Sequence, residues 1–307
     1  MIVLSSEQEW RGGGTAVALG TFDGVHRGHQ RLIERAVQAA RGQGLSAVVS
    51  TFDVHPLSLL CPKQTPLLLN DNPQKARLMA QMGVDALVFN RFTREFAERS
   101  PEEYIERMVR ALHPAYVVAG YNYSFGARGA GNAGLLDKMQ QSMGYRLLIT
   151  EPVVIDERPI SSTWVRESLA QGDLRQTERL LGRPYDLLGQ VIDGKHMGRK
   201  LGFPTANLRL PQGRALPLNG VYVAELKIEG QEVFLPAVLN QGKHPTLPQG
   251  GATIEVHVLN YHGNLYGKQV WVRYRKFLRP ERTFDSVQAL CAQLERDKQA
   301  AQAFFSV

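Results

Sequence analysis

Up to about residue 182, short apolar runs alternate with helical patterns, and this alternation constrains the fold more than any other feature of the chain. In one helical stretch, Leu32, Ile33, Ala36, Val37 and Ala40 follow the spacing that puts apolar side chains on one face. Because strands and helices alternate, we expect an α/β doubly wound parallel sheet, which binds ligands at the carboxyl ends of its strands. The runs predicted as buried strands are Val17–Gly20, Ala47–Thr51, Ala86–Phe89, Tyr116–Ala119 and Leu147–Ile149.

The pattern changes after Arg183-Pro184-Tyr185, where β-rich runs follow one another with turn residues between them. This change predicts a C-terminal antiparallel β-barrel and a division into domains 1–182 and 183–307. The predicted barrel strands are Val221–Ile228, Val233–Val238, Ile254–Leu259 and Val270–Tyr274.

A helix is expected to close the chain after the barrel. Asp285 and Gln288 have the spacing of a capping box, in which two side chains satisfy free backbone N–H groups at a helix start. The predicted inner stripe of this terminal helix is Val287, Leu290, Cys291 and Leu294.

Composition narrows the class of protein. The 307 residues, 43% of them hydrophobic, suffice for two domains with separate cores. The net charge of +7 suits an anionic ligand, but the basic residues form no run of five, so we expect no nucleic-acid partner. No stretch approaches the roughly 18 apolar residues of a membrane span. The oligomeric state stays open, a homo-oligomer included.

The chain has two cysteines, Cys61 and Cys291, which lie far apart and outside any CxxC motif. This spacing indicates neither a disulfide framework nor a thiolate metal site. We therefore expect two buried, inert thiols and a reducing, cytoplasmic location.

The segment LGTFDGVHRGHQRLI is the first candidate site. A predicted strand ends at Gly20, and a helix is expected to begin near Gly28 with His29 on its first turn. Free N–H groups and the helix dipole attract phosphate to such a turn. Two imidazoles, His26 and His29, would stabilise charge on a phosphoryl group, and Gly28 would leave room for a nucleotide. A helix start with two solvated or capping histidines is the alternative.

The HxGH pattern of this segment resembles the HxGH nucleotidylyltransferase superfamily, which implies a Rossmann-like domain. A second motif, ISSTWVRESL, matches the STxxR arrangement of that superfamily through Ser162, Thr163 and Arg166. Ser162 is expected to cap a helix, while Thr163 and Arg166 hold phosphates. A serine-rich helix cap with a surface arginine is the alternative. Class I aminoacyl-tRNA synthetases share HxGH, but no KMSKS-like segment follows here.

Two further segments, TFDVHP and VVAGYNYSFGARGAG, resemble the adenylyltransferase half of bacterial bifunctional riboflavin kinase/FAD synthetases. The resemblance departs at Thr21, where Asn is common, and at Trp164. It implies catalytic roles for His26, His29 and Arg166. The residues implied at the ATP site are Gly20, Phe22, Asp23, Gly28, Ser162 and Thr163, and those implied near the flavin are Phe52, His55, Pro56, Asn122 and Phe125, with Gly126.

The segment DGKHMGRKLGFPTANL is the second candidate site. It is no Walker A loop, yet a glycine-rich basic segment can wrap phosphates with backbone N–H groups. Thr205 and Asn207 lie two residues apart, so on an extended chain their oxygen atoms share one side, where they would suit Mg²⁺. The residues predicted to bind ATP here are Gly194, Lys195, Gly198, Arg199, Gly202 and Pro204.

This segment resembles riboflavin kinase, and GVYVAEL, IEVHVLNYHGNLYGKQV and RYRKFLRPERTFDSVQAL agree in order. The resemblance implies that Glu255 is the catalytic base; a solvent-facing strand glutamate is the alternative. The segment AVLNQGKHPT departs from the usual GVANIGxxPT. A zinc site is not expected, because the histidines of this half are irregularly spaced; they are His196, His244, His257 and His262.

Together the resemblances run from about Ala16 to Phe305. They imply that the C-terminal domain phosphorylates riboflavin with ATP to FMN, and that the N-terminal domain adenylylates FMN with ATP to FAD, both with Mg²⁺. Two alternatives stay open. One is an enzyme with a single working half, and the other is a flavin-responsive regulator that binds a nucleic acid or protein through its basic surface.

Overall fold

The structure is a computed structural model that describes residues 1–194, 198, 201–243 and 252–306. Two of the residues predicted to bind ATP, Lys195 and Arg199, lie outside the described residues. Contacts within the chain divide it into two compact units, Met1–Ser162 and Thr163–Val307. Each unit has a sheet and a core of its own.

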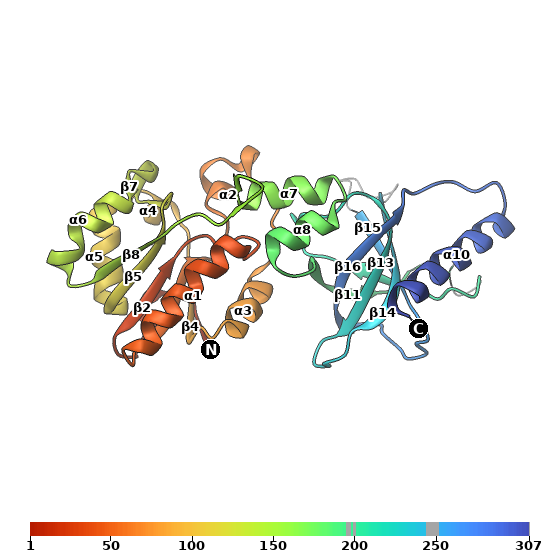
Figure 1. Ribbon diagram of the computed structural model, residues 1–307, viewed down its shortest axis with the longest axis horizontal. Coiled ribbons are helices and arrows are strands. Elements are labelled where there is room, and N and C mark those ends of the chain that lie inside the picture. Colours follow the sequence, from red (N-terminus) through yellow and green to blue (C-terminus); the bar gives the residue numbers. More distant parts are fainter. Residues whose placement is uncertain (195–197, 199–200, 244–251, 307) are drawn as a thin grey trace. The chain divides into compact units, whose positions relative to one another are not determined.

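The first unit is built on a six-stranded parallel sheet with the order β1-β4-β3-β2-β5-β8 (Figure 1). The predicted strands are confirmed, and β1 at the edge was not predicted. Because the chain runs from β2 toward β3 and β4 on one side and later to β5 and β8 on the other, the strand order reverses at β2 and β5. Ligands of such sheets bind at this switch point. The strands are β1 Ile2–Leu4, β2 Thr15–Leu19, β3 Ser46–Phe52, β4 Ala86–Asn90, β5 Pro114–Gly120 and β8 Arg146–Thr150.

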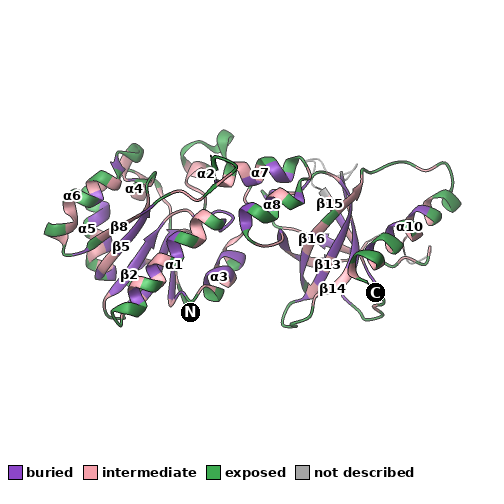
Figure 2. Ribbon diagram, viewed as in Figure 1, coloured by how far each residue is buried: buried purple, intermediate pink, exposed green. Residues whose placement is uncertain are grey.

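Helices cover both faces of this sheet, as the doubly wound prediction requires. Alternate residues of β2 point to opposite cores: Val17 packs in the core that includes α5 and α6, and Ala18 in the core that includes α1 and α3. These helices are α1 Arg27–Gly42, α3 Asn72–Gln81, α5 Pro101–Leu112 and α6 Ala133–Met143. The predicted apolar face of α1 is confirmed, since Leu32, Ile33, Ala36 and Ala40 are buried (Figure 2).

Short elements connect the main ones in the first unit. The short helices are η1 Glu7–Glu9, α2 Pro56–Leu60, η2 Pro62–Gln64, α4 Arg94–Ala97 and η3 Ala127–Gly129. The two small hairpins pair β6 Ser124–Phe125 with β7 Gly131–Asn132, and β9 Val154–Ile155 with β10 Arg158–Pro159.

The second unit contains a closed antiparallel barrel with the order β11-β12-β15-β14-β13-β16. Tyr222 and Tyr274, both almost fully buried, meet edge to face at 5.1 Å between ring centroids. The predicted strand at Val233 begins later, at Leu235, because Val233 is 66% exposed. The elements are α7 Ser162–Ala170, α8 Leu174–Leu181, β11 Asp186–Ile192, β12 Ala206–Arg209, β13 Gly220–Ile228, β14 Leu235–Lys243, β15 Ala252–Val258, β16 Gln269–Arg279 and α10 Val287–Phe305.

The terminal helix α10 exists as predicted, but its predicted capping box was wrong, and of its predicted inner stripe Val287 is exposed while Leu290, Cys291 and Leu294 are half-buried. Ser286 is its N-cap and accepts a hydrogen bond from the Ala289 N–H at 3.1 Å, so no Asp285–Gln288 capping box starts it. Val287 is 58% exposed, and the buried face consists of Gln293, Asp297 and Ala301. Polar contacts anchor this face: the Arg279 guanidinium donates to the Asp297 carboxylate at 2.7 Å.

Candidate functional site

The turn between β2 and α1 has an unusual backbone. Phe22, Gly24 and Val25 have positive φ angles of 50°, 82° and 42°. Such conformations cost free energy in residues other than glycine, and they persist only where the surrounding structure fixes them. Here a buried segment does so, because Gly24 N–H donates to the Asn70 side chain at 3.0 Å and the Asp23 carboxylate accepts from Leu69 N–H at 3.0 Å.

The two histidines of the HxGH motif lie together at the start of α1, as predicted. His26 is the N-cap, and its Nδ1 accepts a hydrogen bond from His29 N–H at 3.4 Å. The two rings stack with centroids 3.7 Å apart. Gly28 keeps this face open, since a Cβ there would lie 3.1 Å from the His26 ring. The capping and the catalytic interpretations of His26 are therefore compatible.

His29 has an electrostatic environment that favours the neutral ring. Burial lowers the pKa of His29 well below its usual range, and the nearby His26 and Lys75 lower it further. Its Nδ1 atom is buried and, among the described residues, has no hydrogen-bond partner. A buried ring nitrogen in this state is costly unless a ligand or water pairs with it. This fits a nucleotide phosphate at the start of α1.

The other residues predicted at this nucleotide site lie around the turn between β2 and α1 or on α7. Phe22 is fully buried in the core, and a Cβ on Gly20 would lie 3.0 Å from its ring. Asp23 is also buried, and its carbonyl accepts a hydrogen bond from the Ser162 hydroxyl at 2.8 Å. Ser162 was expected to cap a helix, which was wrong: it is the first residue of α7, and its hydroxyl is directed to Asp23. Thr163 and Arg166 lie on α7 in the second unit.

A series of aromatic contacts connects the segments TFDVHP and VVAGYNYSFGARGAG, which are predicted to line the flavin pocket. Phe52 contacts Phe92 and Phe96 at 5.0 and 5.5 Å between centroids. Phe96 contacts Tyr104 at 6.0 Å, and Tyr104 contacts Phe125 at 5.1 Å. Spacing in the sequence gave no signal for Phe92, Phe96 or Tyr104, because they lie outside both motifs, on the loop before α4, on α4 and on α5.

The remaining flavin candidates lie around these rings. His55 is the N-cap of α2, and its Nδ1 accepts from Leu57 N–H at 3.2 Å. His55 and Pro56 line, with Phe52, Thr21 and Asp23, a cavity of about 20 Å³, so the flavin candidates after β3 adjoin the HxGH turn. Asn122 is exposed. Gly126 has φ +71°, and a Cβ there would lie 2.8 Å from Pro101, so only glycine fits this position.

In the barrel, strand register brings the predicted kinase residues together. Asn207 on β12 is opposite Glu255 on β15, and Glu255 is opposite Asn240 on β14. Side chains directly opposite on neighbouring strands have Cβ atoms about 5 Å apart. All three are half-buried. Asn240 belongs to the departing segment AVLNQGKHPT and was not predicted, since only the register reveals its place in this row.

Two of the predicted glycines are required by close packing. A Cβ on Gly194 would lie 2.1 Å from the side-chain nitrogen of Asn207. A Cβ on Gly198 would lie 2.3 Å from the Phe203 carbonyl oxygen and 3.2 Å from the Thr205 hydroxyl. Gly202, at φ +81°, instead supplies a turn. Gly194 and Gly198 therefore lie close to Asn207 and Thr205, the two residues predicted to bind Mg²⁺.

A cavity of about 600 Å³ lies beside the start of β12. Thr205 and Pro204 line it, and His257 contacts the Pro204 carbonyl through Nδ1 at 2.8 Å. The loop after β15 supplies most of its other wall, which no sequence prediction included. These wall residues are Tyr261, His262, Gly263, Asn264, Leu265 and Tyr266.

The cysteines differ from their prediction. Cys61 is exposed, because it ends the short surface helix α2, and Cys291 is half-buried on α10. Across the described ranges, no group of three or more His, Cys, Asp or Glu side chains could hold a metal ion. In that same part of the chain, no helix is both long and apolar enough to cross a membrane.

Comparison with known proteins assigns a family to each half of the chain. The FAD synthetase family model matches residues 8–164, and the riboflavin kinase family model matches residues 181–305. A solved structure named as a macrolide-efflux protein from Streptococcus pneumoniae has a TM-score of 0.88 at 31% identity and covers 98% of each chain. The fold of that solved structure is therefore similar to the fold of this chain over nearly its whole length.

Three relatives that are similar in length to this chain have the same name. The bifunctional riboflavin kinase/FMN adenylyltransferase of Listeria monocytogenes serovar 1/2a is 38% identical over 300 residues, 97% of this chain and 95% of the relative. Those of Haemophilus influenzae and Escherichia coli K12 are 35% and 36% identical and cover 95% and 96% of this chain, and 95% and 94% of the relatives. The chain therefore belongs to the bifunctional riboflavin kinase/FMN adenylyltransferase family.

Proposed function

We propose that this chain makes FAD in two steps, phosphorylating riboflavin to FMN in the barrel and adenylylating FMN in the parallel-sheet domain. The observation that carries this proposal is that each half has its own polar constellation: stacked His26 and His29 in the half matching FAD synthetase, and Asn207 opposite Glu255 in the half matching riboflavin kinase. We place the boundary between these catalytic domains at 182/183.

In the adenylylation step, a phosphate oxygen of FMN attacks the α-phosphorus of ATP, the bond from that phosphorus to the α,β-bridging oxygen breaks, and pyrophosphate leaves. His26 and His29 would donate hydrogen bonds to the charge that develops on the α-phosphate. The lowered pKa of His29 keeps its ring neutral, so it contributes a fixed donor and no full charge. Arg166 and Thr163 would hold the leaving phosphates. No protein nucleophile is required.

In the phosphorylation step, the 5′-hydroxyl oxygen of riboflavin attacks the γ-phosphorus of ATP. Glu255 would take the hydroxyl proton, the bond to the β,γ-bridging oxygen breaks, and ADP leaves. Thr205 and Asn207 fit Mg²⁺, because they offer a hydroxyl and an amide oxygen, and Mg²⁺ commonly binds few protein ligands together with substrate phosphates. When bound, Mg²⁺ would neutralise charge on those phosphates.

The cellular setting follows from the substrates. Since ATP is required and both cysteines are free thiols, we propose a cytoplasmic location. A homo-oligomer stays a prediction.

Separate substitutions test the two sites. His29→Ala should slow FAD formation about 100- to 1,000-fold, the cost of removing one such donor, and leave FMN formation unchanged. Glu255→Gln should slow FMN formation about 100-fold or more and leave FAD formation from supplied FMN unchanged. Chromatography of protein incubated with riboflavin or FMN, ATP and Mg²⁺ measures both products.

Exposed residues provide matched controls. Gln38 lies on α1, as His29 does, and Gln38→Ala is the control for His29→Ala. Glu232→Gln repeats the charge change of Glu255→Gln at an exposed position. Each control variant should retain FMN formation and FAD formation. If either active-site change removes both activities while the circular dichroism spectrum is unchanged, the two-site assignment is wrong. If the unaltered chain makes FMN from riboflavin but makes no FAD when FMN is supplied, only the kinase assignment is supported.

A further inference from the structure

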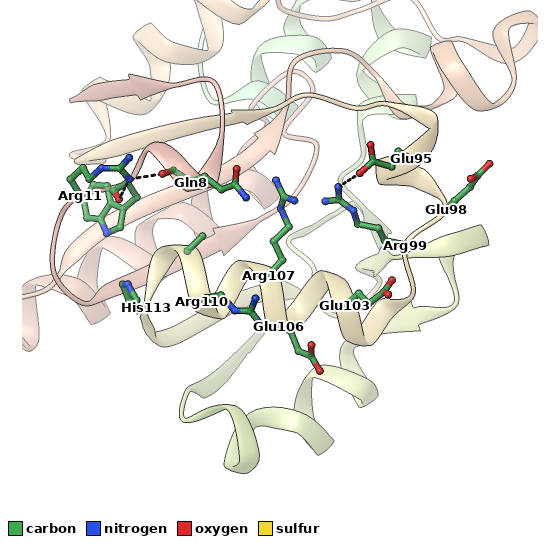
Figure 3. Close-up of a pocket in the computed structure, with 12 residues that line it drawn as sticks. Gln8, Arg11, Glu95, Glu98, Arg99, Glu103, Glu106, Arg107, Arg110 and His113 are labelled. Carbon is green, nitrogen blue, oxygen red and sulfur yellow. Dashed lines mark hydrogen bonds and ion pairs between the residues drawn. The ribbon is translucent and has the colours of Figure 1, made fainter.

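A cavity of about 790 Å³ opens beside α5 in the first unit (Figure 3). None of the residues proposed for adenylylation lines it. One wall is the chain from η1 toward β2, and the others are the end of α4 and one side of α5. The lining residues are Gln8, Trp10, Arg11, Glu95, Glu98, Arg99, Glu103, Glu106, Arg107, Arg110, Ala111 and His113.

Four arginines line this cavity; Arg11 and Arg110 are exposed, whereas Arg99 and Arg107 are less exposed. The Arg99 side chain is only 20% exposed, and its Nη2 donates to Glu95 at 2.8 Å. Its Nη1 atom is buried and, within residues 1–194 and the other described ranges, has no hydrogen-bond partner. Arg107 is half-buried. Figure 3 shows the guanidinium groups of Arg99 and Arg107 directed into the same space as the Gln8 amide.

The carboxylates around the cavity do not neutralise this pair. The Glu95 side chain is 83% exposed, so water screens its ion pair with Arg99. Glu98 and Glu106 are exposed, and Figure 3 shows both pointing away from the guanidinium groups. Glu103 accepts from Ser100 N–H at the start of α5. The negative charges therefore lie at the rim, and the arginines lie deeper.

Behind the arginines lies one buried carboxyl group, that of Glu7. It accepts hydrogen bonds from Ser50 at 2.9 Å and Asn90 at 3.0 Å. Both arginines also act on it electrostatically. One carboxyl group that already has two donors cannot balance two guanidinium groups. Arg99 and Arg107 therefore carry more positive charge than Glu7 can balance, and Figure 3 shows their forked N–H donors directed into the cavity.

We propose that this cavity binds the phosphate group of a small phosphorylated molecule, held by Arg99 and Arg107 with the Gln8 amide beside them. Guanidinium forks match the oxygens of phosphate and form charge-assisted hydrogen bonds with them. The cavity is larger than inorganic phosphate, so it has room for the rest of such a molecule. The site is separate from the proposed catalytic sites and adds a second phosphate-binding place to the first unit.

Calorimetric titration of the full chain tests this site, with inorganic phosphate, pyrophosphate and AMP as separate probes. Arg107→Gln should weaken binding of at least one probe about tenfold or more, because a charge-assisted hydrogen bond is lost. Arg99→Gln should have the same effect. Arg146→Gln, the same charge change at an exposed position on β8, should leave the affinity unchanged. Equal affinity for all three probes identifies the phosphate alone as the recognised group, whereas tighter AMP binding identifies a nucleoside monophosphate.

Arg107→Lys separates binding from folding, since it keeps the charge and loses the fork. It should bind the probe with intermediate affinity. The proposal is overturned if no probe binds saturably, or if Arg107→Gln and Arg146→Gln bind every probe as tightly as the unaltered chain. A probe that binds equally well to all variants would occupy another site, such as the turn at His29. The unfolding temperature of each variant without probe checks that the fold is retained.

Discussion

At the scale of single residues, Glu7 is the side chain whose environment differs most from that of an ordinary surface carboxylate. It connects η1 to Ser50 on β3 and Asn90 on β4, and those two side chains also bond to each other at 2.8 Å. Burial raises the pKa of Glu7, although Ser50, Asn90 and the two cavity arginines lower it in part. The ionised form therefore costs more in the folded chain than in the unfolded chain.

This raised pKa predicts a pH-dependent effect of Glu7→Gln. As pH rises above about 4.5, the unfolded chain releases the Glu7 proton more readily than the folded chain, so ionisation favours unfolding. Glutamine keeps an oxygen acceptor for Asn90 and cannot ionise. The change in unfolding free energy caused by Glu7→Gln should be more favourable at pH 7 than at pH 4, as measured by urea denaturation. If Glu7→Gln changes the unfolding free energy equally at both pH values, the pKa of Glu7 is not raised in the folded chain.

Some of these residues could be predicted from sequence, and others could not. His26 and His29 were found because they are close together in the chain and flank a glycine. Asn207 was predicted because it lies two residues from Thr205 on one extended segment. Glu7 and Asn240 had no such signal, because their partners are distant in the sequence: Glu7 on η1 bonds to Ser50 on β3, and strand register sets Asn240 opposite Glu255. Local motifs reveal the residues that one segment presents, and register reveals those that several strands share.

At the scale of elements, α10 demonstrates where apolar spacing fails. The sequence predicted an apolar inner stripe, yet the side of α10 that packs on the barrel carries Gln293 and Asp297. The Arg279 and Asp297 side chains are 17% and 4% exposed, and Gln293 donates to Asp297 at 2.8 Å. A buried ion pair with a third partner can attach a helix through polar contacts, which hydrophobic periodicity does not detect. By contrast, α1 followed its apolar pattern because it packs on apolar sheet residues such as Ala18, Val49 and Val118.

This attachment predicts a large effect of Asp297→Ala. Removing the carboxylate leaves the Arg279 guanidinium, which is only 17% exposed, without its opposite charge. This loss should lower the unfolding free energy by about 3 kcal/mol. Glu295→Ala, on the same helix, breaks the Glu295–Lys298 pair, whose side chains are 45% and 31% exposed. That change should cost less than about 1 kcal/mol. Chemical denaturation of both variants compares them, and similar losses would show that α10 is held by something other than this pair.

At the scale of the whole molecule, both fold classes could be predicted, because the period of the apolar pattern changes once along the chain. The periods did not predict β1, β11 and β12, which lie outside the predicted apolar runs and pair with neighbouring strands. Each unit has its own core, with Met108 fully buried in one and Tyr222 in the other.

Separate cores predict separate unfolding. Met108→Ala should destabilise the first unit by about 2–5 kcal/mol, because it leaves a cavity between α5 and the sheet. Differential scanning calorimetry should then show one transition at lower temperature and another at the temperature seen in the unaltered chain. A single transition that moves as a whole would mean that the units unfold together.

The two sheets also differ in how they end, and this difference bears on misassembly. Every barrel strand is hydrogen-bonded to a neighbour on both sides, so the barrel gives a foreign chain no row of backbone groups to join. The parallel sheet stops at β1, where Ile2 and Val3 are 51% and 53% exposed. Exposed apolar edge strands template aggregation. Fibril or aggregate growth from partly unfolded protein should therefore start at this edge, and Val3→Lys should slow it while both enzyme activities continue.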